Sequence, residues 1–249
     1  MKTVAVLIDF DNIFPRVISE YQNGEIEFTI TKVKDKVLLD HPDLENLIIR
    51  FYGGWYAGNV LTSRASSIAS MIPTLQGIFP IHLPPNRLVH GSVELASQLY
   101  SSAYVWYDSY REHKGLPKLR IDHNVMGTTC STSSEHCPVK ILKKFVEKKN
   151  RICSNAGCST MHSQVFFERT QKYVDTMIAC DVISMSMEED IVAIYVFSDD
   201  VDIFPSFAVS SSLTMTPTKL HLLILNDQNE KSYQNLLNNF GVNVSLLIL

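Results

Sequence analysis

The chain has 249 residues, 45% of them hydrophobic and 19% charged, which allows one α/β domain with an insertion or two small domains. Its 22 basic and 26 acidic side chains give a formal net charge of −4, which excludes nucleic-acid binding through overall positive charge but permits a local basic surface. No segment approaches the roughly 20 apolar residues of a membrane-spanning helix, and the apolar start of the chain is too short for a signal peptide, so we expect a soluble, cytoplasmic protein that binds no membrane.

Apolar, β-branched runs that end in polar or turn residues predict strands. In chain order these runs are 4–8, 46–55, 78–83, 191–198, 220–225 and 242–249. Apolar residues at helical spacing predict helices. The helical segments are 33–39, 59–77, 170–187, a segment beginning near 205, and 233–240, whereas 93–107 suits either element. This alternation predicts an α/β fold with a mainly parallel sheet flanked by helices.

Two acidic clusters follow predicted strands at opposite ends of the chain. The first is Asp9-x-x-Asn12, and the second is the run Ser198 to Asp202, which holds three carboxylates within four residues. In open α/β sheets the ligand crevice lies outside the carboxyl ends of the strands. Crowded carboxylates repel each other, and a hard cation such as Mg²⁺ relieves that repulsion. The pattern therefore predicts a metal site, although Asp9 and Asn12 could instead only cap the next helix.

A third polar element lies on the predicted helix 170–187. Lys172 and Asp175 are three residues apart, so on a helix they would share one face. A surface ion pair is the simpler interpretation of this pair, and a contribution to the acidic site is the alternative.

In this order, the segments 7–12, 171–175 and 196–202 resemble the motifs of the NYN family of PIN-like nucleases. The resemblance covers roughly residues 3–110 and 165–249. It implies a Rossmann-like, PIN-like sheet and a metal-dependent ribonuclease, of the endonuclease type, that cleaves RNA, with single strands as the expected substrate. One such domain would span 1–249, with an inserted Cys-rich, basic subdomain at about 122–164.

The resemblance also implies roles for individual residues. Asp9, Asp175 and Asp200 would hold one or two Mg²⁺ or Mn²⁺ ions, and Asp202 would complete the acidic pocket. Asn12 would position the phosphate or a ligand water, Ser198 would hydrogen-bond near the metal, and Lys172 would contact a phosphate. Asp199 stands where the family usually has glycine, and Asp11 is an additional carboxylate that we place outside the ligand set.

Two other functions fit parts of the pattern. A non-catalytic nucleic-acid-binding protein would keep the fold with an altered site. A haloacid-dehalogenase-like phosphatase would use Asp9 as nucleophile and Asp11 as general acid. That family expects Asp-x-Asp-Gly-Thr, whereas Asn12 and Ile13 follow Asp11 here.

The segment 122–164 holds four of the five cysteines. Four thiolates can hold a structural Zn²⁺, and the candidates are Cys130, Cys137, Cys153 and Cys158, with His162 as an alternative ligand that would replace Cys130. Ordinary reduced thiols in a loop are the other interpretation. The fifth cysteine, Cys180, is expected in the core.

A basic run over 140–151 lies between the cysteine pairs, with six basic residues against one acid. It is the best candidate to attract a polyanion toward an acidic active site, and a solvated helix face is the plainer interpretation. The expected nucleic-acid contacts are Lys143, Lys144, Lys148 and Lys149, together with Lys172. The oligomeric state stays open.

Overall fold

The computed structural model describes residues 1–15, 24–114, 152, 157–213, 218–225, 229–239, 241–242 and 244–249. The chain divides into two compact units. The larger comprises Met1–Tyr110 and Gln171–Leu249, and the smaller comprises Arg111–Thr170.

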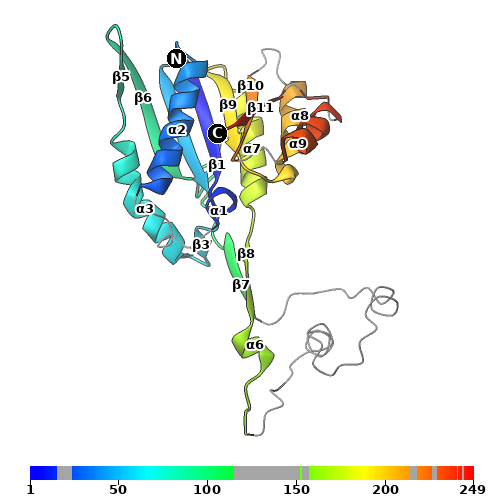
Figure 1. The fold of residues 1–249 in the computed structure, drawn as a ribbon. Helices are drawn as coiled ribbons and strands as arrows, with labels where there is room; N and C mark the ends of the chain where they lie inside the picture. Colours follow the sequence, from blue (N-terminus) through cyan, green and yellow to red (C-terminus); the bar gives the residue numbers. More distant parts are fainter. Residues whose placement is uncertain are drawn as a thin grey trace. The chain divides into compact units, whose positions relative to one another are not determined.

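A seven-stranded sheet runs through the described part of the larger unit, in the order β11-β10-β9-β1-β2-β6-β5 (Figure 1). All neighbouring strands are parallel except the β5–β6 pair at one edge, which is antiparallel. The strands are β1 Thr3–Asp9, β2 Asn46–Tyr52, β5 Ile81–Leu83, β6 Arg87–Leu95, β9 Ile191–Phe197, β10 Lys219–Ile224 and β11 Val244–Ile248. The α/β class and the mainly parallel sheet predicted from the sequence are therefore confirmed.

The chain adds strands to both sides of β1, first on one side and later on the other. From β1 the chain adds β2 and then β6 toward one edge, and later returns to the other side of β1 with β9, β10 and β11. The carboxyl ends of β1 and β9 therefore lie at a topological switch point, where open α/β sheets form their ligand crevice.

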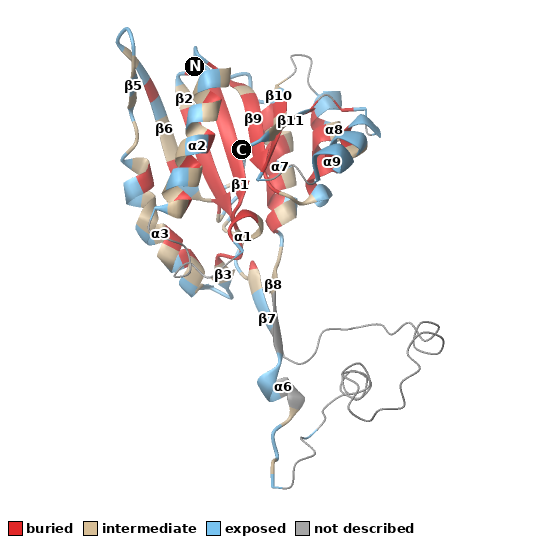
Figure 2. Ribbon diagram, viewed as in Figure 1, coloured by how far each residue is buried: buried red, intermediate tan, exposed pale blue. Residues whose placement is uncertain are grey.

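The two faces of the sheet build separate cores because side chains alternate along each strand. Val4, Val6 and Ile8 of β1 belong to the cluster that includes α2 (Glu25–Asp40) and α3 (Ser63–Gln76). Ala5 and Leu7 belong to the cluster on the other face, which includes three helices. These are α7 Val174–Ser186, α8 Phe204–Leu213 and α9 Glu230–Asn239. Burial on both faces explains why the central strands are apolar throughout (Figure 2).

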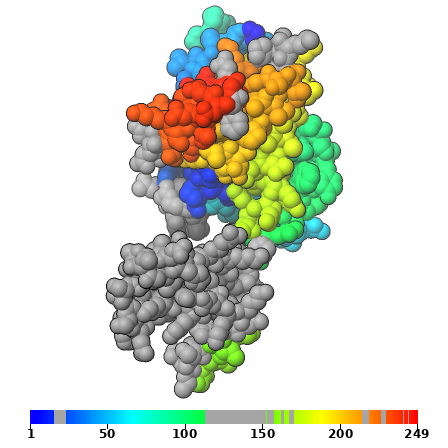
Figure 3. All heavy atoms as spheres, turned by 90° about the vertical axis from the view of Figure 1, so that its right-hand side faces the viewer, coloured from blue at the N-terminus to red at the C-terminus, as the bar shows by residue number. Residues whose placement is uncertain are grey.

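The carboxyl-terminal part of the chain packs as a layer on the second face. The ring of Tyr233 on α9 contacts that of Phe204 on α8 edge-on, with centroids 5.9 Å apart. The space-filling view shows the red surface of α9 and the chain end beside the orange surface of α8 (Figure 3). This contact matters for the site, because α8 follows directly on the acidic loop at the end of β9.

Several predicted boundaries are wrong. The helix expected over 59–77 begins only at Ser63, where the Thr62 hydroxyl caps it by accepting from Ala65 N–H at 3.1 Å. It follows a short hairpin of β3 (Tyr56–Ala57) and β4 (Val60–Leu61). Residues 33–39 belong to the longer helix α2, and 93–107 are neither one strand nor one helix, because β6 ends at Leu95.

The smaller unit contains two paired strands, β7 (Tyr110–Lys114) and β8 (Phe167–Gln171), and the short helix α6 (His162–Val165). Most of the expected insertion at about 122–164 lies outside the described residues. Among the helices that are described, none has the length and apolar character needed to cross a membrane.

Candidate functional site

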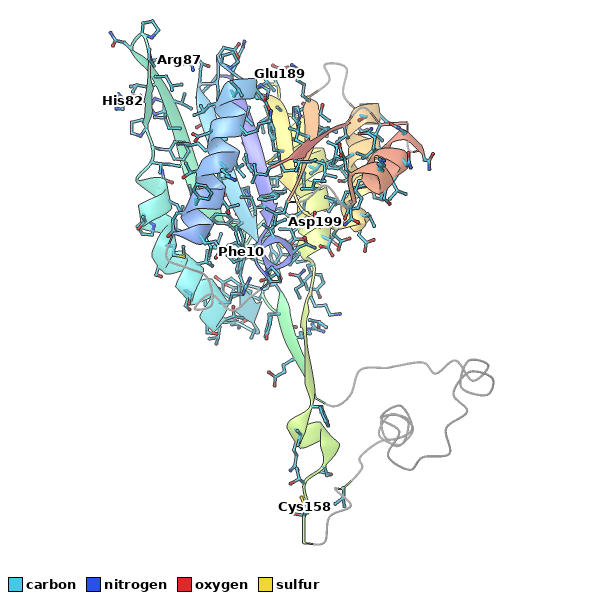
Figure 4. All side chains as sticks on the ribbon, viewed as in Figure 1. Phe10, His82, Arg87, Cys158, Glu189 and Asp199 are labelled. Atoms are coloured by element: carbon cyan, nitrogen blue, oxygen red, sulfur yellow. The ribbon has the colours of Figure 1, made fainter. Side chains whose placement is uncertain are left out.

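The two acidic clusters meet at the switch point. Residues Ile8 and Phe197 are paired in the β1–β9 register, so Asp9 and Ser198 end neighbouring strands. Asp9 is fully buried, at 0% exposure, and the Ser198 hydroxyl donates to Asp9 Oδ2 at 3.2 Å. Phe10 and Asp199, the residues that follow each of them, lie at this same end of the sheet (Figure 4).

A side chain from the first cluster holds the backbone of the second. Asn12 Oδ1 accepts a hydrogen bond from Asp199 N–H at 2.9 Å, across 187 residues of sequence. Asn12 N–H in turn donates to Asp9 Oδ1 at 3.3 Å, so Asp9 caps the four-residue helix α1 (Phe10–Ile13). Asp9 therefore caps the helix as the capping interpretation expects, whereas the Asn12 side chain does not cap it and instead fixes the geometry of the acidic loop.

The loop after β9 is ordered by its own side chains. The Ser198 hydroxyl accepts from Asp200 N–H at 3.0 Å, and Asp200 Oδ1 accepts from Asp202 N–H at 2.9 Å. Asp200 thereby caps the short 3-10 helix Val201–Ile203. The Tyr233 hydroxyl donates to the Asp199 carbonyl at 2.7 Å, which ties the loop to α9.

Asp175 approaches from a third segment, in the first turn of α7. Its Oδ1 atom is buried and has no hydrogen-bond partner among the described residues. Burial raises the pKa of Asp175, and the charges of Asp200 and Asp202 raise it further. The carboxylates of Asp175, Asp200 and Asp202 therefore share one electrostatic environment.

Asp9 belongs to the same environment. Burial raises its pKa from 3.8 to about 7, and the charge of Asp175 is the second cause. The hydrogen bonds from Asn12 and Ser198 oppose this shift only in part. The loops at the ends of β1 and β9 and the start of α7 thus bring four predicted acidic residues together, with Asp175 repelled by Asp9 and by the Asp200–Asp202 pair.

The chemistry of these residues suits a hard cation. Buried carboxylates that repel one another need a proton or a cation, and oxygen ligands are what Mg²⁺ and Mn²⁺ take. The unpartnered oxygen of Asp175 fits this role. In the described ranges, however, no group of three or more acidic, histidine or cysteine side chains forms a metal-binding cluster.

Asp11 faces a different set of partners. Its Oδ2 atom accepts from Gly54 N–H at 2.7 Å, and its Oδ1 atom lies 2.6 Å from Arg64 Nε on α3. The Arg64 guanidinium also covers the Phe10 ring, 5.1 Å from its centroid. Asp11 thus links α1, the turn after β2, and α3, as expected for a carboxylate outside the ligand set. No short motif in the sequence signals this link, because Asp11 and Arg64 lie 53 residues apart.

The prediction that Lys172 and Asp175 share a helical face is wrong. Helix α7 begins at Val174, after Tyr173, which has a left-handed backbone with a φ of 68°. Lys172 lies before this turn, and its N–H donates to the Ser109 carbonyl at 2.7 Å. Lys172 itself is half-buried.

A buried polar network that sequence reasoning missed anchors α7. Asp181 is fully buried and accepts from the Tyr52 hydroxyl at 2.5 Å and from Tyr100 N–H at 2.8 Å. The buried Arg50 lies 3.6 Å from Asp181 and donates to the Gln98 carbonyl at 2.5 Å. Since these partners come from β2 and from the segment after β6, the network fixes the helix that carries Asp175.

Most of the other predicted residues lie outside the part of the chain that the structure describes. Cys130, Cys137, Cys153, Lys143, Lys144, Lys148 and Lys149 lie outside the described residues, as does the side chain of His162. Cys158 is half-buried in the smaller unit. The zinc site and the basic contacts therefore stay predictions. Cys180, expected in the core, is instead exposed on α7.

Comparison of the chain with known proteins gives no relatives. No protein-family model matches it. No curated protein and no solved structure matches it either.

Proposed function

We propose that the chain is a metal-dependent ribonuclease, an endonuclease of the NYN type, whose centre is formed by Asp9, Asp175 and Asp200 with Asp202. One observation supports this most strongly. Three segments far apart in the sequence bring these carboxylates together at the switch point of the sheet, where their burial and charges raise the pKa values of Asp9 and Asp175.

The roles of the residues follow from their contacts. Asp9, Asp175 and Asp200 would hold the ion, and a bound Mg²⁺ or Mn²⁺ would supply charge neutralisation at the phosphate and a water of lowered pKa. Ser198 orients Asp9 through its hydrogen bond, and Asp202 N–H orients Asp200. Asn12 holds the loop that carries Asp200 in register with β1.

Membership of the NYN family is part of this proposal. It rests on the order of the three motifs, and the Rossmann-like arrangement of the sheet is compatible with it. A structural Zn²⁺ in the Cys-rich segment and RNA contacts from the basic run belong to the same proposal.

A nucleic-acid-binding protein without cleavage is the second candidate. The observation in its favour is that the described side chains do not form a closed metal-binding group. The phosphatase interpretation is less favoured, because the carboxylate of Asp11 is engaged by Gly54 and Arg64 and is poorly placed to act as a general acid.

A cleavage assay tests the proposal. End-labelled single-stranded RNA is incubated with the full chain in Mn²⁺, in Mg²⁺ or in chelator. We expect internal cleavage only with metal, and a loss of about 100-fold or more in Asp200→Asn. Asp190→Asn is the matched control, because Asp190 lies just before β9, at its other end, and pairs with the chain's N-terminus. Binding of RNA with no metal-dependent cleavage would favour the second candidate.

A further inference from the structure

Exposed aromatic side chains gather next to the acidic site. In the described part of the larger unit, five aromatic residues are exposed. Tyr104, Tyr107 and Tyr173 each contact a partly buried aromatic ring, Trp106 or Tyr56. The other two are Phe28, on α2, and Tyr100, whose ring lies beside Arg50. We call the rings of Tyr56, Tyr104, Trp106, Tyr107 and Tyr173 the aromatic surface.

One row of rings leads to the acidic site from the side of α7. The Tyr104 and Trp106 centroids are 5.4 Å apart, and Trp106 lies 5.7 Å from Tyr173. Tyr173 precedes Asp175 by two residues. The space-filling view shows the green surface of the segment after β6 directly beside the yellow-green surface of α7 (Figure 3).

A second ring pair lies beside the other flank of the site. Tyr56 and Tyr107 meet edge-on with centroids 5.2 Å apart. Tyr56 follows Gly54, whose N–H binds Asp11, and its own N–H donates to the Ser109 hydroxyl at 3.0 Å. The aromatic surface thus includes one group of rings next to the start of α7 and another next to the turn after β2.

Backbone hydrogen bonds fix the segment that carries several of these rings. The backbone N–H of Trp106 donates to the Ser97 carbonyl at 2.7 Å, and that of Asp108 donates to the Gly58 carbonyl at 3.0 Å. Tyr104 remains 64% exposed and Tyr173 43% exposed, so both side chains are accessible to a ligand. A segment with an ordered backbone loses less entropy when a ligand binds to it.

We propose that the aromatic surface binds single-stranded RNA by stacking its bases on Tyr104, Trp106 and Tyr173, with a phosphate at Lys172. The identity of the polymer as RNA rests on the proposed nuclease function. Every base has a π-face, so recognition of this kind tolerates any sequence. It excludes a duplex, because paired bases are already stacked on one another. The rings would deliver the backbone to the acidic site.

Fluorescence of the full chain measures the stacking directly. Trp106 is partly exposed, whereas Trp55 is fully buried, so quenching by a ligand reports on Trp106. The titration is done in chelator, where binding is measured without cleavage. The probes are oligouridylate, oligoadenylate, an abasic strand of equal length, and a duplex. We expect quenching by both base-bearing single strands and little by the abasic strand or the duplex.

Variants assign the effect to individual rings. Tyr104→Ala and Tyr173→Asn should each weaken binding by roughly 5- to 150-fold, and Asn tolerates the left-handed backbone of residue 173. Tyr104→Phe and Tyr173→Phe should bind like the parent, because they keep the ring. Phe28→Ala, which removes an exposed ring on α2, is the matched control and should leave affinity unchanged.

The outcomes separate this inference from the nuclease proposal. Equal quenching by the abasic strand, unchanged affinity in Tyr104→Ala and Tyr173→Asn, or no binding of any oligonucleotide would overturn the stacking proposal. Metal-dependent cleavage alongside such a result would leave the nuclease function standing. Conversely, base-dependent binding with no cleavage in any metal would support the aromatic surface and reject the nuclease.

Discussion

Burial determines how Asp9 takes up and releases its proton. Asp9 is fully buried at the end of the central strand, and its pKa of about 7 leaves it divided between the charged and neutral forms near neutral pH. Its two oxygens already accept from Asn12 and Ser198, so its orientation is fixed. Such a group is ready to exchange a proton for a cation with little rearrangement.

Replacement of Asp9 should change the pH dependence of stability in the metal-free protein. The folded pKa lies above the unfolded value of 3.8, so the stability from the buried proton is complete below pH 3.8 and is lost as the pH rises through about 7. Asp9→Asn carries no buried charge. Its melting temperature in chelator should therefore gain about 5 °C relative to the parent between pH 5 and pH 8. A constant difference at both pH values would contradict the raised pKa.

Asp199 stands where the NYN family, which the motifs resemble, usually has glycine, and replacing it tests whether this difference matters. Its φ is not in the left-handed region, so the backbone does not require glycine there. Burial alone raises its pKa, with no contribution from the other carboxylates. Because only its backbone groups contact Asn12 and Tyr233, Asp199→Asn should keep cleavage within about twofold of the parent. A loss as large as that in Asp200→Asn would make Asp199 a ligand.

At the scale of elements, the Arg50–Asp181 network fixes α7 against β2. Asp181→Leu removes the buried partner of Arg50 and the acceptor of the Tyr52 hydroxyl and of Tyr100 N–H, so it should lower the free energy of unfolding by about 3–5 kcal/mol in a urea titration. Arg50→Met added to it should recover most of that loss. Glu94→Gln is the control: Glu94 also pairs with Arg50, at 3.2 Å, but its side chain is 48% exposed, and its loss should cost less than about 1 kcal/mol. No recovery in the double variant would contradict a pairwise link.

The elements differ in how far the sequence predicts them. The central strands are predicted correctly because burial on both faces makes them apolar throughout, and Asp9 and Asp200 are candidates because they lie at the end of such a strand or in the loop after it. The segment after β6 shows no periodic pattern of apolar residues. Contacts with distant residues hold it in place, such as the hydrogen bond from Arg50 to the Gln98 carbonyl. The start of α7 was missed because the left-handed turn at Tyr173 has no local signal such as glycine.

At the scale of the whole molecule, a half-buried histidine has a pH effect on stability opposite to that of Asp9. His221 on β10 stacks on Tyr195 at 4.2 Å between ring centroids, near His41. Burial lowers its pKa to about 4, with the charges of His41, Lys219 and Lys36 acting in the same direction and Asp40 against it. The stability it contributes is therefore complete above pH 6.5 and is lost as the pH falls toward 4. Between about pH 4 and pH 6.5 the two groups therefore act in opposite directions: the stability contributed by His221 rises with pH, whereas that contributed by Asp9 falls.

His221→Phe should remove the loss of stability that protonation of His221 causes at acid pH. The ring still stacks on Tyr195 but cannot take up a proton. Melting temperatures measured from pH 7 to pH 4 should fall less steeply in His221→Phe than in the parent. Parallel curves for the two proteins would show that His221 does not titrate in this range.

Binding of Mn²⁺ tests the central claim, that carboxylates from three distant segments form one metal site. Titration followed by electron paramagnetic resonance should give saturable binding of one or two ions to the parent chain. Asp175→Asn should weaken it by at least about tenfold, and Asp190→Asn should leave it unchanged. Absence of saturable binding to the parent, or equal binding by Asp175→Asn, would contradict the claim.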